Sequence, residues 1–435
     1  MFVKLIRIFP VAMLFLALCF NSAGAQGNSI AVLKVKGAIT PVVAGYLERG
    51  ITAAESAGAS VVVIEMDTPG GLDTSMREIV QTIIGAKIPV VVFVSPAGAR
   101  AASAGAFITL AAHVAVMAPN TAIGAAHPVS IGSGGATEVP ETMEEKIVND
   151  AVAYIRSSAT LRNRNVEWAE KIVRESVSAT ETEALQLKVI DFIANDTQDL
   201  IRQLDGRQVT LLSGQSVTLQ TGGASIIEYP MTGTERFLFT LSNPNLAYIL
   251  LSVAMLGILL ELYNPGAILP GIVGGIALFL ALYSLGMLEA NWAGLLLIAL
   301  AFVFFAAEFF TSSFGMLLIG GVISLIFGSL LLFPSPEFSI DIGLIAGVVG
   351  IITVTLTLVL IAVLRTHKKK QVTGVEGMIG RTGVVRTALN PKGTILVHGE
   401  LWAAVSQSGV VEPGEDVEVE KVDGLRLSVS KINSA

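Results

Sequence analysis

The sequence predicts three successive parts: an α/β domain, a polytopic α-helical membrane domain and a small all-β barrel. Apolar runs rich in β-branched residues alternate with helix-like stretches from about residue 26 to 206. Strongly apolar segments fill residues 246–364, and short strand-like pieces with Gly and Pro turns fill residues 373–432. At 435 residues, the chain is too long for one ordinary domain. Its 52% hydrophobic and 14% charged residues indicate a membrane protein.

The N-terminus has the pattern of a secretory signal peptide over residues 1–25. Lys4 and Arg7 precede an apolar run from Ile8 to Phe20, and a small-residue site ends at Ala25. An uncleaved membrane anchor is the alternative interpretation. Cys19, the only cysteine, lies inside this segment, so we expect the mature chain to have no disulfide, no cysteine nucleophile and no thiolate metal site.

Residues 26–206 read as a parallel α/β sheet. We expect strands at Ile30–Val35, Val61–Met66 and Pro89–Val94. Runs that are apolar on both faces and are joined by helices favour a parallel sheet. The loops that follow such strands hold the ligands of these folds. The helices between them are expected at Val42–Ser56, at Leu72–Ala86 and after Ser103.

Residues 207–240 read as a β extension and linker, with strand-like pieces at Gln208–Leu212 and Ser216–Gln220. Five apolar spans follow, near 246–262, 268–288, 292–310, 314–333 and 342–364. Each approaches the ~20 residues needed to cross a bilayer. Arg365 and the lysines at 368–370 follow the last span, which marks that end as cytoplasmic.

Two carboxylates occur at similar places in the membrane region. Glu261 and Glu308 each end an apolar run and precede a Gly-rich run, which indicates a weak internal repeat of 47 residues. Carboxylates within membrane spans are candidates for function. An equally good interpretation is that Glu261 and Glu308 simply lie at the membrane interface, near the ends of their spans. The spans' glycines are better explained by close helix packing.

The tail at residues 373–432 predicts a barrel with strands at Gly383–Thr387, Thr394–Val397, Asp416–Val422 and Arg426–Val429. Nucleic-acid binding is not expected. The net charge is −7, acidic side chains are frequent in this segment, and Trp402 is its one tryptophan. A structural or protein-binding barrel is the better interpretation.

Ser103 lies in a run of small residues, Ala101–Gly105, which lets the backbone turn sharply and a peptide approach closely. Acyl transfer needs a nucleophile, a base and backbone donors for the oxyanion. Ser103 alone would read as a helix N-cap. Asp67–Gly71, at the end of an earlier strand, favours a nucleophile instead. The expected oxyanion donors are the N–H groups of Gly70, Gly71 and Ala104.

Three residues are candidates for the base. His113 follows Ala111 and Ala112 on the expected Ser103 helix and reads as a helix-end residue. Lys146 opens an amphipathic helix, and a lysine removed from water loses its proton more readily. His127 precedes a Gly- and Ser-rich segment, Val129–Pro140, which we expect to act as a flap. Histidine titrates close to neutral pH, which suits a base.

The chain resembles the long form of the NfeD proteins, which are membrane-bound serine peptidases. The resemblance covers nearly the whole chain. It is carried by Met66–Gly71, Ala102–Gly105, Ile123–Pro128, Glu145–Asp150, Gly399–Ala404 and Val422–Leu425.

The resemblance implies a Clp-protease/crotonase-like fold, related to signal-peptide peptidase A, and an OB-like C-terminal barrel. It also implies a Ser103–Lys146 dyad that cleaves hydrophobic peptide segments without ATP. Related Clp proteases use a histidine placed much as His127 is, so His127 stays the alternative base. A stomatin-like membrane protein is implied as partner and substrate, together with a dimer or higher homo-oligomer.

These features together predict a multi-pass serine endopeptidase of the bacterial inner membrane, with no cofactor and no metal. The α/β domain is expected outside the cytoplasm and the barrel inside it. A non-catalytic scaffold that organises stomatin-like proteins is the main alternative. A crotonase-like acyl-thioester enzyme would need acidic catalysts in place of Ser103, and a transporter would rest on Glu261 and Glu308 alone.

Overall fold

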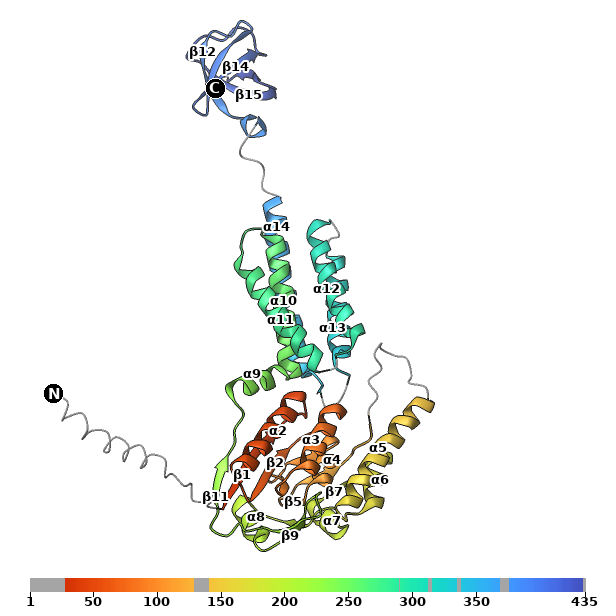
Figure 1. The fold of residues 1–435 in the computed structure, drawn as a ribbon. Helices are drawn as coiled ribbons and strands as arrows, with labels where there is room; N and C mark the ends of the chain where they lie inside the picture. The colour runs from red at the N-terminus through yellow and green to blue at the C-terminus, as the bar shows by residue number, and fades with distance from the viewer. Residues whose placement is uncertain are drawn as a thin grey trace, which may run out of the picture. The chain divides into compact units, whose positions relative to one another are not determined.

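The computed structural model describes residues 28–128, 141–288, 290–311, 315–334, 338–367 and 375–432 (Figure 1). The expected signal peptide at 1–25 and the expected flap, Val129–Pro140, lie outside the described residues. The chain forms two compact units, Met1–Val354 and Thr355–Ala435.

A six-stranded sheet forms the centre of the N-terminal domain, and every neighbouring pair in it is parallel. This confirms the predicted parallel α/β sheet. In spatial order the strands are β11 (Ser225–Glu228), β1 (Ser29–Lys36), β2 (Val61–Asp67), β3 (Val90–Val94), β5 (Val114–Met117) and β8 (Phe192–Ile193).

Helices cover this sheet and connect its strands. They are α2 (Pro41–Ser56), α3 (Asp73–Gly85), α4 (Ala104–Ala111), α5 (Glu141–Leu161), α6 (Val166–Arg174), α7 (Glu181–Gln186) and α8 (Thr197–Leu204). Alternate residues of β1 enter two separate hydrophobic cores: Leu33 packs with α2 and α3, and Val32 packs with α8. Burial on both faces explains why these strands read as continuous apolar runs.

A second, three-stranded sheet lies beside the first and supports the loop that carries Ser103. It contains β4 (Arg100–Ala102), β6 (Ala122–Gly124) and β7 (Ser178–Thr180). β4 pairs parallel to β6, and β6 pairs antiparallel to β7. The end of β4 therefore has a fixed position next to β6.

The expected β extension contains a short antiparallel hairpin, β9 (Gln208–Thr210) with β10 (Ser216–Thr218). The segment after it adds β11 to the edge of the main sheet, where Ile226 is the register partner of Ile30. Helix α9 (Gly233–Leu241) then leads toward the membrane helices. The last strand of the extension is therefore part of the same sheet as β1, whereas its hairpin forms a sheet of its own.

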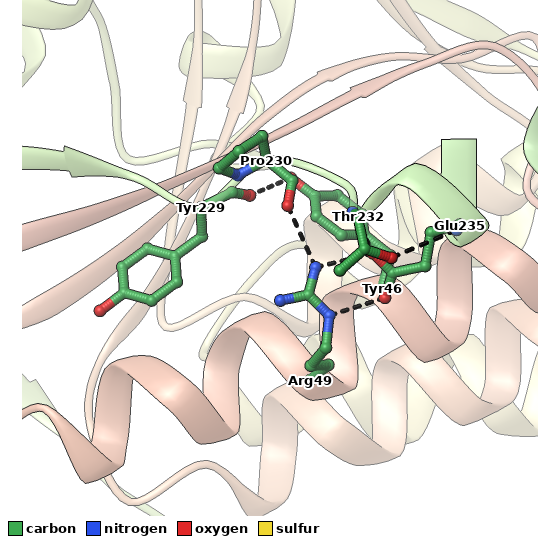
Figure 2. A network of polar contacts seen from close by, with 6 residues as sticks. All are labelled: Tyr46, Arg49, Tyr229, Pro230, Thr232 and Glu235. Atoms are coloured by element: carbon green, nitrogen blue, oxygen red, sulfur yellow. Dashed lines mark hydrogen bonds and ion pairs between the residues drawn. The ribbon is translucent and has the colours of Figure 1, made fainter. Parts of the chain in front are cut away.

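A polar network fastens this segment to α2 (Figure 2). The Arg49 guanidinium bonds both carboxylate oxygens of Glu235, at 2.6 and 2.8 Å, and donates to the Pro230 carbonyl at 3.1 Å. The Tyr46 hydroxyl donates to the Tyr229 carbonyl at 2.8 Å. Thr232 and Glu235 form a capping box that begins α9. The entry to the membrane region is thus bonded to the N-terminal domain.

Among its described residues, the membrane region contains five apolar helices at the places of the predicted spans. They are α10 (Pro244–Tyr263), α11 (Leu269–Met287), α12 (Trp292–Phe310), α13 (Met316–Leu332) and α14 (Ile342–His367). Four of them, α10, α11, α12 and α14, are long and apolar enough to cross a membrane. α13, with 17 residues, is the short one, at the lower limit of about 17 residues for a span.

Glycines let these helices pack in close pairs. A Cβ on Gly257 of α10 would lie 2.6 Å from the Pro270 carbonyl of α11, and one on Gly294 of α12 would lie 2.6 Å from the Leu332 amide of α13. The packing role predicted for the glycines agrees with these contacts.

Glu261 and Glu308 have matching positions in the two helix pairs. Glu308 is buried and accepts the N–H groups of Gly315, Leu317 and Leu318 at 2.8–3.3 Å. Glu261 accepts N–H groups at 266 and 268 at 3.4 and 3.3 Å. Each carboxylate therefore bonds the backbone at or just before the start of the next helix, where unpaired N–H groups favour negative charge.

The second unit contains a closed five-stranded barrel, which confirms the predicted all-β tail. A short 3₁₀ turn, η2 (Val375–Met378), precedes β12 (Thr382–Thr387), β13 (Lys392–Val397), β14 (Glu400–Ser406), β15 (Asp416–Asp423) and β16 (Arg426–Lys431). Ile395, Val417 and Leu427 are among its buried residues. β14 is not among the strands predicted from the sequence.

Candidate functional site

Ser103 immediately precedes α4 and has an unusual backbone conformation, with φ +51° and ψ −119°. Its amide donates to the Gly124 carbonyl at 3.0 Å, which ties it to β6. Its side chain forms no capping hydrogen bond and is half-buried. The N-cap interpretation is therefore not realised. A positive φ on a serine between a strand and a helix is typical of a nucleophile that is held away from the backbone.

The loop Asp67–Gly71 lies directly against the Ser103 segment. The Thr68 amide donates to the Arg100 carbonyl at 2.8 Å, and the Ala102 amide donates to the Thr68 carbonyl at 3.2 Å. Gly105 is needed here because a Cβ would lie 2.6 Å from the Thr68 side chain. The structure thus brings together the serine and the glycine loop that the sequence singled out.

The three expected oxyanion donors differ in their bonding. The Gly70 amide donates to the Thr68 hydroxyl at 3.1 Å, so it is already used. The Gly71 amide donates to no group in the described part of the chain. Ala104 is the first residue of α4, and the first N–H groups of a helix have no partner within it. Gly71 and Ala104 are therefore the better pair of donors. The role of Thr68 was missed, and no sequence signal marked it.

Lys146 lies near the start of α5, on a face that is turned toward α3 and α4. Asp150, one turn later, accepts from Arg77 of α3 at 2.5 Å. Tyr154, two turns later, stacks on Phe107 of α4 with ring centroids 6.3 Å apart. Residues spaced by four share a helix face. The Lys146 side chain is exposed and bonds no other described residue, Ser103 included.

His127 is held by α6 and faces α5. Its Nδ1 lies 2.7 Å from the Val173 carbonyl oxygen and, because a carbonyl only accepts, Nδ1 donates. Its Nε2 lies 3.9 Å from a Glu144 carboxylate oxygen. No hydrogen bond joins His127 to Ser103 in the described structure.

His113 is a structural residue, in agreement with its prediction as a helix-end residue. The Val90 amide donates to its Nδ1 at 3.2 Å, and its Nε2 lies 3.3 Å from the Arg162 guanidinium. Burial, and then the positive charges of Arg162 and Arg164, lower the pKa of His113 to about 3. Arg164 is buried and donates to the carbonyls of Leu110, Ala112 and Val189, and it pairs with Asp191 at 3.1 Å.

In the described residues, no group of three or more His, Cys, Asp or Glu side chains is placed to hold a metal ion. A cavity of about 290 Å³ lies between β1, α2 and residues 228–239. None of its lining residues is a predicted site residue.

Three family descriptions match successive parts of the chain. Residues 29–205 match the NfeD1b N-terminal domain, residues 245–364 the NfeD integral membrane domain, and residues 375–431 the NfeD-like C-terminal, partner-binding domain. These matches follow the three parts predicted from the sequence.

Two curated proteins are similar over nearly their whole length. The membrane-bound protease PH1510 of Pyrococcus horikoshii is 39% identical over 415 residues, which is 92% of this chain and 93% of that protein. The membrane protein NfeD1b of Bacillus subtilis is 29% identical over 433 residues, 94% of each chain. A solved structure of 1510-N, a Pyrococcus horikoshii membrane protease specific for a stomatin homolog, is 33% identical. It covers 50% of this chain and 99% of its own, with a TM-score of 0.43.

The matches to all three family descriptions and the near full-length similarity to PH1510 confirm the resemblance stated above: this chain belongs to the NfeD family.

Proposed function

We propose that this chain is a membrane-anchored, ATP-independent serine endopeptidase that cleaves hydrophobic segments of membrane proteins. Ser103 is the nucleophile and Lys146 the base. The conformation of Ser103 carries the proposal, because its hydroxyl is not used as a helix cap and its backbone is held at φ +51° at the start of α4. The Gly71 amide, in the loop that contacts this segment, has no acceptor among the described residues. The similarity to a membrane-bound protease supports the same activity.

The proposed chemistry gives each of these groups one role. The neutral Lys146 amine takes the proton from the Ser103 hydroxyl as Oγ bonds to the peptide carbonyl carbon. The resulting oxyanion accepts the N–H groups of Gly71 and Ala104. The lysine then gives the proton to the leaving amine, and water later releases the acyl group. A bound apolar peptide excludes water from Lys146, which is exposed without it.

The partner we propose is a stomatin-like membrane protein, as the family resemblance implies, and it is both substrate and binding partner. The match of residues 375–431 to a partner-binding domain supports a protein ligand for the barrel. We further propose a dimer or higher homo-oligomer, which the mass of the detergent-solubilised chain would test.

For location, we propose a bacterial inner membrane protein with the α/β domain outside the cytoplasm and the barrel inside. The signal-like N-terminus supports the first placement, and the basic residues after α14 support the second. Five membrane crossings are consistent with both placements. In that arrangement α13 must cross the membrane although it has only 17 residues. A reporter protein fused after residue 432 would show on which side the barrel lies.

The deciding experiment is cleavage of a synthetic stomatin-type hydrophobic peptide by the full chain in detergent. The variants are Ser103→Ala, Lys146→Ala and His127→Ala, with Lys171→Ala as a matched control because Lys171 is an exposed lysine on α6. We expect the first two to lose cleavage and the last two to keep it. ATP should not change the rate.

Other outcomes assign the site differently. Loss of cleavage in His127→Ala, with Lys146→Ala active, would move the base to His127. The absence of any bond between Lys146 and Ser103 favours the second candidate function, a non-catalytic scaffold for stomatin-like proteins. Binding of the peptide without cleavage by the wild-type chain would support that function and contradict the peptidase.

A further inference from the structure

The outer surface of the C-terminal barrel carries a contiguous apolar face. In β14, Trp402, Ala404 and Ser406 point toward the barrel interior, so Leu401, Ala403 and Val405 point outward. All three outward residues are apolar. An ordinary barrel strand has polar residues at such positions.

Neighbouring strands extend this face. Leu396 of β13 is the register partner of Leu401, and Val384 of β12 is the register partner of Leu396. Leu425 directly precedes Arg426, the register partner of Ala403 on β16. Leu401 is 68% exposed and Leu425 is 83% exposed. We call the set the apolar face; it consists of Val384, Leu396, Leu401, Ala403, Val405 and Leu425.

Two cations flank the apolar face. Lys392 of β13 is the register partner of Val405, and Arg426 of β16 is the register partner of Ala403. Both are exposed, and neither forms an ion pair within residues 375–432. The barrel's other basic residues include Lys421 and Lys431, which pair with Asp423 and Glu415.

Acidic side chains occupy other positions around the apolar face. Asp416 of β15 is the register partner of Val384 and lies beyond that end of it. Glu400 lies beside Leu401 and accepts the indole N–H of Trp402 at 3.1 Å. Asp423 is the register partner of Arg426 and pairs with Lys421. Lys392 and Arg426 are therefore the cations in register with β14 that have no ion-pair partner in the described barrel.

The barrel is closed, so it offers no free strand edge for pairing. A ligand that binds the apolar face must do so with side chains rather than by adding a strand. An amphipathic helix can bind in this way. Its apolar residues at i, i+3, i+4 and i+7 would contact the apolar face, and carboxylates on either side of that stripe would pair with Lys392 and Arg426.

We propose that the apolar face is the docking site of the barrel, and that its ligand is an amphipathic helix with acidic flanks in the stomatin-like partner. This rests on the proposed function, which supplies that partner. Docking at the barrel holds the partner to the enzyme by contacts separate from Ser103.

Binding of the purified stomatin-like protein of the source organism tests this. It is measured in nanodiscs against the full chain carrying Ser103→Ala, which prevents turnover. Leu401→Glu with Leu425→Glu should raise Kd at least about 10-fold, because charge replaces apolar anchors. Val410→Glu is the matched control, since Val410 is 56% exposed, apolar and outside the apolar face. Its Kd should not change. Because a glutamate pair can disturb folding, Leu401→Ala with Leu425→Ala should weaken binding in the same direction.

Charge and geometry are tested separately. Arg426→Glu should raise Kd and reduce its dependence on salt. In a Cys19→Ser background, Leu401→Cys offers a single thiol. A thiol-to-amine cross-linker there should reach partner residues spaced three or four apart on one helix, whereas the same reagent at Val410→Cys should not.

Each other result overturns the proposal in a distinct way. Wild-type binding that the leucine variants leave unchanged refutes the apolar face but leaves the stomatin-like partner intact. No wild-type binding refutes both. If the leucine variants lose only self-association of the chain, the occupant is a second copy and not a partner helix.

Discussion

Gly71→Ala is expected to reduce peptide cleavage about 100-fold while leaving the protein folded. Gly71 has φ +155°, and a Cβ there would lie 2.2 Å from the Ile39 carbonyl oxygen, 2.5 Å from its amide nitrogen and 2.7 Å from its Cα. These are backbone atoms that no rotamer change can move away.

The size of the effect follows from this contact. Cβ contacts under 3.0 Å are essentially never seen, so the 2.2 Å contact requires the two segments to separate by about 0.8 Å. An oxyanion donor displaced by roughly 1 Å loses most of its bond in the transition state, which costs on the order of 100-fold in rate. The same movement stretches the two backbone bonds that join Ile39 to Gly70 and Leu72, at a cost of about 1–3 kcal/mol in folding.

The assay compares kcat for the hydrophobic peptide with thermal unfolding of the full chain in detergent. Gly45→Ala is the control, because nothing lies within 4 Å of a Cβ added to Gly45 in α2. It should keep the wild-type rate and raise stability by up to about 1 kcal/mol. A Gly71→Ala protein with a kcat within about twofold of wild type would refute the oxyanion assignment.

Three further predictions concern the framework. The pKa of His113 is lowered to about 3 by burial and then by Arg162 and Arg164, whereas an unfolded histidine titrates near 6.5. Below about pH 6.5 the unfolded state binds a proton that the folded state does not bind. The contribution of His113 to the free energy of unfolding is therefore fully present above about pH 6.5, and it is lost toward pH 3 by at most about 1.4 kcal/mol per pH unit. His113→Gln should reduce the dependence of the free energy of unfolding on pH between about 3 and 6.5, measured by denaturant unfolding at each pH. An unchanged pH dependence would contradict the role of His113. Arg164→Met should lower the free energy of unfolding by about 3 kcal/mol, seen as a lower Tm, because three carbonyls and Asp191 lose a buried donor; wild-type Tm would count against it. Arg49→Ala should speed hydrogen exchange in α9 because the bonds to Glu235 are lost, and exchange rates equal to wild type would show that the network does not hold α9.

The sequence predicted the parallel sheet well because its signal is local. Strands β1, β2 and β3 are runs of apolar, largely β-branched residues buried on both faces, and no long-range contact is needed to recognise them. Ser103 and Asp67–Gly71 could be paired because both were expected in loops after strands, where such folds hold their ligands. In the structure, Asp67–Gly71 begins at the end of β2 of the main sheet and Ser103 follows β4 of the second sheet.

The elements that were missed depend on tertiary contacts. β14 lacks the alternation of a surface strand because its outward residues, Leu401, Ala403 and Val405, are apolar. β11 is exposed along its length and is a strand because it pairs with β1. The choice between Gly70 and Gly71 as donor depended on the Thr68 hydroxyl, whose position no sequence pattern gives. The distance of Lys146 from the serine likewise depends on how α5 packs.

The position of β11 has a consequence for how this protein is made and handled. β11 covers the edge of β1, yet it is synthesised last in its domain, 16 residues before α10 begins. Until β11 is synthesised and paired, the edge of β1 presents unpaired backbone groups to any other extended chain. A nascent or truncated chain that ends near residue 206 is therefore a candidate for edge-to-edge aggregation. The last strand of the sheet is therefore synthesised shortly before the first membrane helix.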